Sequence, residues 1–335
     1  MKRRQGSWPI FAMLGLFGLV FLGPREALPQ QTDRVRLVLD WVVGGSHAPY
    51  FSALKNGYYR EANLEVSISR GYGGADGIKR IAAGEGDLNI GETSAVIASR
   101  AVGALVKLAA VMYQNPPFAI YALKSSGIQA PKDLEGRSIG APANDSMRFL
   151  FPAFAALNQI DEAKVRWVTI GPEAKMSALL SGQVDAITFF VLQDVRLAKM
   201  TAAKGGANRI AYADHGFQIY SLGLIAPEHY LKGRGDVVRR FLAATFRGYQ
   251  FAFENPQKAL DLLLQDHPLL DREVVTGEFT EVRKLVLTED TKARGIGWIS
   301  REKMEKTRDF VTQHFKLEKV VPVEDLYTTE YLPKK

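Results

Sequence analysis

The sequence of 335 residues contains no cysteine, and this absence excludes several kinds of chemistry. The protein has no disulfide bond, no thiolate metal site, no thiol nucleophile and no anchor on a lipid-modified cysteine. Its five histidines show no paired metal-binding spacing, so we expect no bound metal. The sequence also lacks a G-x-S-x-G elbow and a G-x-x-x-x-G-K-[ST] phosphate loop, and we expect neither a cofactor nor an enzyme of those classes.

Long basic runs are missing as well, although the formal net charge is +7. Four basic residues and one acidic residue fall in residues 1–27, so the remainder carries a net charge of +4, spread along the chain. This pattern favours a solvated basic surface over nucleic-acid binding.

Long apolar runs are confined to the N-terminus. The uncharged stretch Trp8–Gly23 follows Lys2, Arg3 and Arg4, which is the pattern of a secretory signal peptide. The stretch is shorter than the ~20 residues of a bilayer-spanning helix. We predict a signal peptide over residues 1–27 and a periplasmic protein. Because Arg25 stands where a small residue is preferred before the cleavage site, an uncleaved anchor is the alternative.

The rest of the chain alternates strand and helix patterns, which predicts an α/β fold with two doubly wound lobes, a hinge and a cleft between them. Two stretches, 81–92 and 179–190, end a helix with glycine, pass through an aspartate and enter a strand, which indicates two units of similar plan. We place lobe 1 at residues 34–122 and 222–335, with the C-terminal helices, and lobe 2 at residues 123–221.

The ends of the predicted strands carry the candidate binding residues, because ligands of open α/β sheets lie beyond the carboxyl ends of strands. In "LDWVVGGSHAPY", Asp40 and Trp41 end a strand, two glycines turn the chain, and His47 precedes a helix with Tyr50 in its first turns. Trp41 and Tyr50 offer stacking faces. The structural alternative is that Trp41 packs in the core and His47 only caps the helix.

Three further strand ends supply polar or aromatic groups. Glu92 is suited to accept hydrogen bonds from a ligand, and Thr93 or Ser94 to cap the next helix. A solvated Glu92 and a simple helix cap at Asp145 or Ser146 are the alternatives. Phe189 and Phe190 must point to opposite faces of their strand, so one of them is expected in the core. The candidates in these segments are Glu92, Thr93, Ser94, Asn144, Ser146 and Phe190.

These residues resemble a known family, the periplasmic substrate-binding proteins of ABC importers in the thiamine-pyrimidine-precursor, nitrate, taurine and alkanesulfonate group. The resemblance covers nearly all of the chain after the leader and is strongest over 39–66, "LDW…HAPYF.AL..GYY.EANLEV", with support from "AAGEGDLNIGETSAV", "LLSGQVDAI" and "GIGWIS". It departs at "ITFFVLQD", where pyrimidine binders of the family tend to have tryptophan with asparagine and glutamate nearby.

The resemblance implies a type II periplasmic binding fold and a monomer that closes on a small molecule and delivers it to a membrane permease and its ATPase. It places Asp40, Trp41, His47, Tyr50, Glu92, Thr93 and Ser94 on one side of the cleft and Asn144, Ser146 and Phe190 on the other. A planar nitrogen heterocycle is the leading ligand, and a small sulfonate or carboxylate held by helix N-termini and Arg148 is second. The alternatives are an enzyme with a reactive His47, acting on a pyrimidine- or pyridoxal-like substrate, and a sensor subunit that imports nothing. Fungal pyrimidine synthases of related fold carry a cysteine-rich motif that this chain lacks.

Overall fold

The computed structural model describes residues 1, 6, 32–143 and 145–333. Residues from Thr32 onward form one compact unit. The predicted signal peptide, apart from Met1 and Gly6, and the candidate Asn144 lie outside the described residues. Among the described residues no helix has the length and apolar character needed to cross a membrane.

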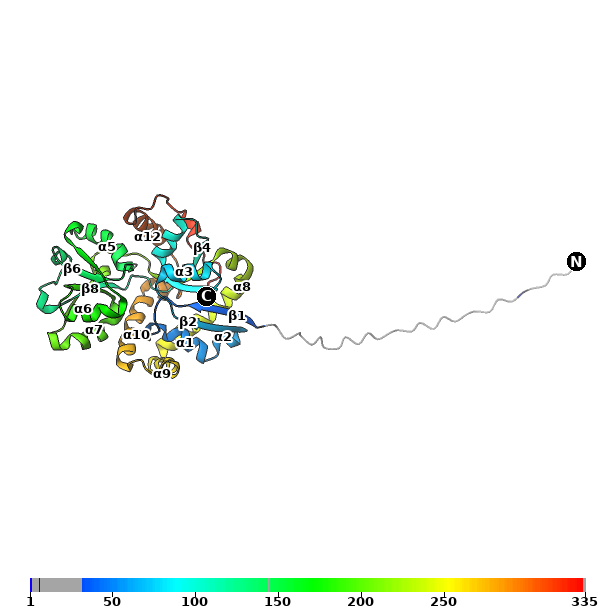
Figure 1. Ribbon diagram of the computed structural model, residues 1–335. Coiled ribbons are helices and arrows are strands. Elements are labelled where there is room, and N and C mark those ends of the chain that lie inside the picture. Colours follow the sequence, from blue (N-terminus) through cyan, green and yellow to red (C-terminus); the bar gives the residue numbers. More distant parts are fainter. Residues whose placement is uncertain (2–5, 7–31, 144, 334–335) are drawn as a thin grey trace. The chain divides into compact units, whose positions relative to one another are not determined.

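Two five-stranded sheets form the framework (Figure 1). The first has the strand order β2-β1-β3-β10-β4, in which β1 runs parallel to β2 and β3 while β10 is antiparallel to β3 and β4. We call this sheet and the helices packed on it lobe 1. Its strands are β1 (Asp33–Val38), β2 (Leu64–Ser69), β3 (Leu88–Glu92), β4 (Val106–Val111) and β10 (Leu222–Pro227).

The second sheet repeats this plan, with the order β7-β6-β8-β5-β9. Here β6 runs parallel to β7 and β8, and β5 is antiparallel to β8 and β9. We call this sheet and its helices lobe 2. The two α/β sheets confirm the predicted fold class. The strands of the second sheet are β5 (Phe118–Leu123), β6 (Ser138–Ala141), β7 (Arg166–Thr169), β8 (Ala186–Phe190) and β9 (Ala207–Ala211).

Helices cover both sheets, and the C-terminal helices pack mainly on lobe 1, where α8 and α9 lie against α1. Two 3-10 helices at strand ends, η1 (Gly45–His47) and η6 (Val191–Gln193), matter for the site. The helices of lobe 2 are α5 (Ser146–Leu157), α6 (Lys175–Leu180) and α7 (Asp194–Thr201). The others are α1 (Ala48–Lys55), α2 (Tyr58–Glu61), α3 (Gly74–Ala82), α4 (Thr93–Ala101), α8 (Glu228–Glu254), α9 (Pro256–Asp266), α10 (Arg272–Val286), α11 (Glu289–Arg294) and α12 (Arg301–His314).

The chain passes from one sheet to the other twice, between β4 and β5 and between β9 and β10. The two crossings are paired: Ser221 N donates to Tyr113 O at 3.1 Å, and Tyr113 N donates to Leu222 O at 3.0 Å. The first crossing precedes β5, whereas the predicted boundary of lobe 1 lies after residue 122. Strand β5 belongs to lobe 2, because its hydrogen-bond partners are β8 and β9.

The internal repeat is built the same way in both lobes. Gly84 and Gly182 each end a helix with φ of +75°, a conformation that glycine adopts without strain. Three residues later, Asp87 Oδ2 accepts from Arg36 N and Asp185 Oδ2 accepts from Ser138 N, both at 2.8 Å. Each aspartate therefore ties the start of its strand to the neighbouring parallel strand.

Replacing Asp185 tests this connection. Burial works against ionisation of Asp185, but the hydrogen bonds from Ser138 hold its pKa below the ordinary value. We expect Asp185→Ala to lower the free energy of unfolding by about 1–3 kcal/mol at pH 7, measured by urea denaturation. Asp185→Asn keeps an acceptor oxygen for Ser138 N and Oγ and should lose less. Equal losses in the two variants would contradict this role.

Candidate functional site

The two glycines after β1 are where helix α10 meets the chain. A Cβ on Gly45 would lie 2.0 Å from Val275 O, and one on Gly44 would lie 2.5 Å from Glu278 Oε2. Only glycine permits this approach, which lets Gly45 N donate to Glu278 Oε2 at 2.6 Å. A residue of the C-terminal region thus binds the turn that follows the first strand.

His47 is held by hydrogen bonds at both ring nitrogens. Gly44 N donates to Nδ1 at 3.1 Å, so in this arrangement the ring proton is on Nε2, which donates to Asp40 Oδ1 at 2.9 Å. The side chain is buried. His47 therefore fixes the orientation of the Asp40 carboxyl and offers no free nitrogen to a substrate.

Glu92 links the two lobes. It ends β3 in lobe 1, is only 5% exposed, and accepts a hydrogen bond at 3.1 Å on Oε1 from Ser146 Oγ at the start of α5 in lobe 2. The other oxygen, Oε2, is buried and has no partner among the described residues. Burial raises the pKa of Glu92 to about 7, with a further contribution from the negative charge of Asp40.

Helix α10 makes a second link between the lobes. It packs on η1 of lobe 1 and on η6 and α7 of lobe 2, and it lies between the two sets of elements in Figure 1. Gln193 Nε2 donates to Glu278 Oε1 at 2.9 Å. A Cβ on Gly277 would lie 2.2 Å from Val195 Cγ2, so α10 and α7 approach closely there.

On the lobe 2 side, Asp145 is the N-cap of α5. Its Oδ1 accepts from the backbone N of Met147 and of Arg148, and its Oδ2 accepts from Thr188 Oγ1 at 2.9 Å. The buried Lys175 lies 3.7 Å from Asp145, donates to Thr188 O at 2.6 Å and stands over the Phe189 ring. This network fixes the first turn of α5 and hence Ser146.

Four residues predicted to contact a ligand are instead packed or hydrogen-bonded within the protein. Tyr50 offers no stacking face, because its ring packs in the core of lobe 1 and its hydroxyl accepts from Tyr249. The Thr93 hydroxyl is buried and donates to Ser221 O at 2.7 Å, beside the crossing. Ser94 is buried in the first turn of α4. Arg148 is turned towards Thr169 and Trp167.

The aromatic candidates divide as follows. Trp41 is 39% exposed, so it is a surface residue rather than a core residue. Phe190 is half-buried and packs against Phe118, whereas Phe189 joins the other face of the sheet, as the strand period required. The structure thus pairs Asp40 with His47 and Glu92 with Ser146, and the charge of Asp40 acts on Glu92. Trp41 and Phe190 remain aromatic neighbours of strand ends.

Three residues that the structure places at the junction, Lys175, Gln193 and Glu278, were not among the predicted site residues. Glu278 lies in an amphipathic helix more than 230 positions after Gly45, and nothing in that helix marks it. Gln193 carried a weak signal, since it follows the strand end at which the family pattern is broken. Among the described residues no group of three or more side chains is placed to hold a metal ion.

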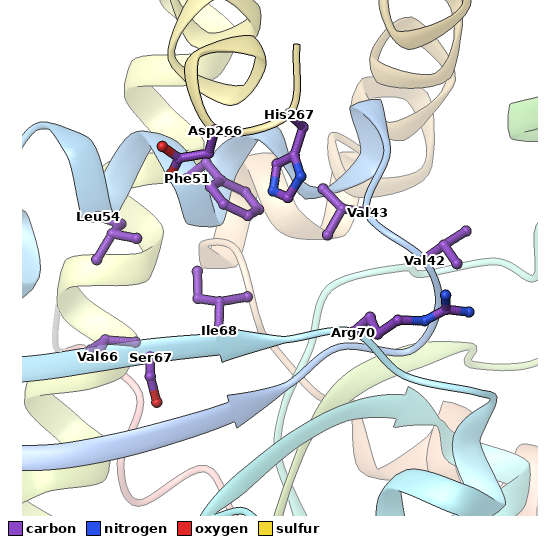
Figure 2. Close-up of a pocket in the computed structure, with 10 residues that line it drawn as sticks. All are labelled: Val42, Val43, Phe51, Leu54, Val66, Ser67, Ile68, Arg70, Asp266 and His267. Carbon is purple, nitrogen blue, oxygen red and sulfur yellow. The ribbon is translucent and has the colours of Figure 1, made fainter. Parts of the chain in front are cut away.

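A separate hollow of about 610 Å³ lies within lobe 1 alone. Figure 2 shows its lining side chains, which come from the loop after β1, from α1 and β2, and from the end of α9. Its walls include Phe51, Leu54 and Ile68. In the part of the chain that the structure describes, its lining residues all belong to lobe 1, so this hollow does not lie between the lobes.

Comparison with known proteins gives a consistent result. A family model described as NMT1/THI5 like matches residues 45–259. A 4-amino-5-hydroxymethyl-2-methylpyrimidine phosphate synthase of Legionella pneumophila is 26% identical over 315 residues, which cover 92% of this chain and 95% of that protein. A formylaminopyrimidine-binding protein of Halalkalibacterium halodurans is 25% identical over 323 residues, covering 94% and 96%.

Solved structures share the fold. The alkanesulfonate-binding protein SsuA from Xanthomonas axonopodis pv. citri, bound to MOPS, matches with a TM-score of 0.71 and 15% identity, covering 90% of this chain and 99% of that one. At this identity the likeness concerns the fold alone, which is that of the periplasmic binding proteins.

Glu92 gives a pH-dependent prediction. Because its pKa rises from 4.5 in the unfolded chain to about 7 in the folded protein, its contribution to stability is fully present below pH 4.5 and is lost as pH rises through about 7. Glu92→Gln should therefore equal the wild type at pH 4 and exceed it by about 3 kcal/mol at pH 8, measured by urea unfolding. The exposed Glu318→Gln is the control. A difference that is the same at both pH values would contradict the burial argument.

Gly45→Ala tests the packing of α10. The new methyl group would overlap Val275 O, so we expect a loss of about 1–3 kcal/mol in the free energy of unfolding. Gly233→Ala is the matched control, because an added Cβ meets no atom within 4 Å there, and in helix α8 alanine should be neutral or slightly stabilising. Equal effects in the two variants would refute the close approach.

Proposed function

The chain belongs to the NMT1/THI5-like family, and on this premise we propose that it is an extracytoplasmic solute-binding protein of an ABC importer. Its ligand is a small planar nitrogen heterocycle, with a thiamine-precursor-like pyrimidine as the leading candidate, bound where the two lobes meet. The protein acts in the periplasm as a monomer and is recognised by a membrane permease with its ATPase. The binding-protein relative and the shared fold support this proposal.

One observation carries the proposal: the Glu92 carboxyl stands between the lobes with one oxygen bound to Ser146 and the other unpartnered. A buried polar atom without a partner costs about 1–3 kcal/mol, and a ligand that supplies the missing hydrogen bond recovers that free energy. A carboxyl group with a pKa of about 7 can donate as an acid or accept as a carboxylate. It therefore matches the edge of an aminopyrimidine, where an N–H donor lies next to a ring-nitrogen acceptor.

The mechanism is a shift in population. A ligand that contacts both lobes binds the closed form better than the open form and therefore favours closure. In this chain Glu92 from lobe 1 and Ser146 from lobe 2 already share a hydrogen bond, so a ligand that bonds to either group acts across the junction. The permease then recognises the closed form.

A synthase among the relatives makes an enzyme the second candidate. Against it, both ring nitrogens of His47 are engaged, and the chain has no cysteine. For His47 to act as a general base or nucleophile, one of its ring nitrogens must be free to reach the substrate. The contacts of His47 suit a supporting residue.

The test is to identify what the purified protein holds. We expect native mass spectrometry to detect a co-purified heterocycle, and pyrimidines added to the stripped protein to raise its melting temperature. His47→Asn should weaken retention, because Asp40 loses its donor, and no chemical product should form with the wild type. Turnover of the bound molecule by the wild type would favour the enzyme. A bound sulfonate without a ring would refute the leading ligand.

A further inference from the structure

Carboxyl groups gather where the two lobes meet. Asp40 follows β1, Glu92 ends β3, Asp145 caps α5 and Glu278 comes from α10. The charges of Asp40 and Asp145 both act on Glu92. The side chains of Glu92, Asp145 and Glu278 are each less than a tenth exposed. Such a junction has a negative field that favours cationic ligands and repels anions.

At two of the helix starts beside the junction, carboxyls of the protein already accept hydrogen bonds from backbone N–H groups that would otherwise bind an anion. Helix N-termini attract anions because their first N–H groups have no partner within the helix. At α5 the Asp145 side chain accepts from two of these groups. At η1 Glu278 accepts from Gly45 N, and at α4 the N-cap residue is Glu92 itself. The protein's own acids fill or adjoin all three positions.

The basic side chains beside this cluster are also committed. Lys175 is bound to Thr188 O and Asp145 and stands over the Phe189 ring. His47 donates its ring proton to Asp40, and Arg148 donates to Thr169. Arg196 lies near Glu278 but is exposed. None of these groups is arranged to neutralise a second negative charge at Glu92.

One polar atom in the cluster lacks a partner. Oε2 of Glu92 is buried, whereas Oε1 takes the hydrogen bond from Ser146. The missing partner of a buried carboxyl oxygen is either an N–H group or, for the protonated acid, a lone pair on a basic nitrogen. A protonated nitrogen base supplies the N–H group, and the same base in its unprotonated form supplies the lone pair.

We propose that the ligand is a nitrogen base that shares one proton with Glu92 in the closed complex, and that the junction rejects anions. This inference rests on the proposed function and narrows its ligand class. In the complex the proton lies on the hydrogen bond between Glu92 Oε2 and the basic nitrogen, so the pair contains one proton whichever group carries it.

The proton has a predictable source. In the free protein burial raises the pKa of Glu92 to about 7, so at pH 8 the carboxyl is mostly ionised. Asp40, Asp145 and the hydroxyl of Ser146 are the groups that act on it there. A base that is neutral at pH 8 then brings no proton, and binding must take one from solvent. The affinity should fall about tenfold for each pH unit above 8.

Isothermal titration calorimetry at pH 8, in two buffers of different ionisation enthalpy, counts this proton. The probes are 4-amino-2-methylpyrimidine and ethanesulfonate, added to the purified, stripped protein. We expect uptake of about one proton with the pyrimidine and no heat with the sulfonate. Glu92→Gln should bind the pyrimidine without proton uptake and with an affinity independent of pH. Glu318→Gln, an exposed change of the same kind, should behave as the wild type.

The outcomes separate this inference from the function on which it rests. Pyrimidine binding with no proton uptake would overturn the shared proton and leave the heterocycle-binding function intact. Sulfonate binding as tight as that of the pyrimidine would overturn the rejection of anions. If ethanesulfonate binds and the pyrimidine does not, both the inference and the leading ligand fail. If neither probe gives heat, the inference is overturned.

Discussion

The structure depends on carboxyl groups that are buried where the two lobes meet and must each find a hydrogen-bond partner. Asp40 is paired with His47, Asp145 with the first turn of α5, and Glu278 with Gly45 and Gln193. An ionised group removed from water is costly unless it is hydrogen-bonded, so these pairs fix the loops that carry them. Glu92 alone among the four has a buried oxygen without a partner. Among these four carboxyls, Glu92 is therefore the one with a hydrogen bond still to be made in the described part of the chain.

The unpartnered Glu92 oxygen lies where the two lobes meet. The paired crossings, held by Tyr113 and Ser221, connect the sheets continuously, whereas the contacts at Ser146 and Gln193 are single hydrogen bonds between side chains. Opening the junction would break those two bonds, the ion pairs of Lys199 in α7 with Asp271 and Glu273, and the close packing of Gly277 on Val195, but no strand pair of either sheet. The free energy of these few contacts between the lobes is comparable to the binding free energy of a small ligand. On the proposed function, ligand binding can therefore shift the lobes between open and closed positions.

Much of this could be predicted from the sequence. The strand and helix patterns predicted two α/β units, and the glycine–aspartate repeat is the same connection in each lobe because Asp87 and Asp185 perform the same task. The family resemblance is confirmed by the family model. Glu92 and Ser146 were found because they follow strands. Tyr50, however, lies in the first turn of α1, and only packing decides that its ring faces the core. The membership of β5 and the role of Glu278 depend on contacts between distant segments, which local patterns do not contain.

The same fold hosts proteins named as binders and as synthases, so the fold alone does not decide the function of this chain. The hydrogen bonds that the groups at the strand ends already make are the better guide to that function. A histidine bonded to a carboxylate through one nitrogen and to a backbone N–H through the other is well placed to orient and poorly placed to react. The Glu92 carboxyl differs from this histidine, because its Oε2 has no hydrogen-bond partner among the described residues. On the proposed function, the hydrogen bond that Glu92 leaves open is available to a ligand, and the free energy gained on making it contributes to closing the lobes.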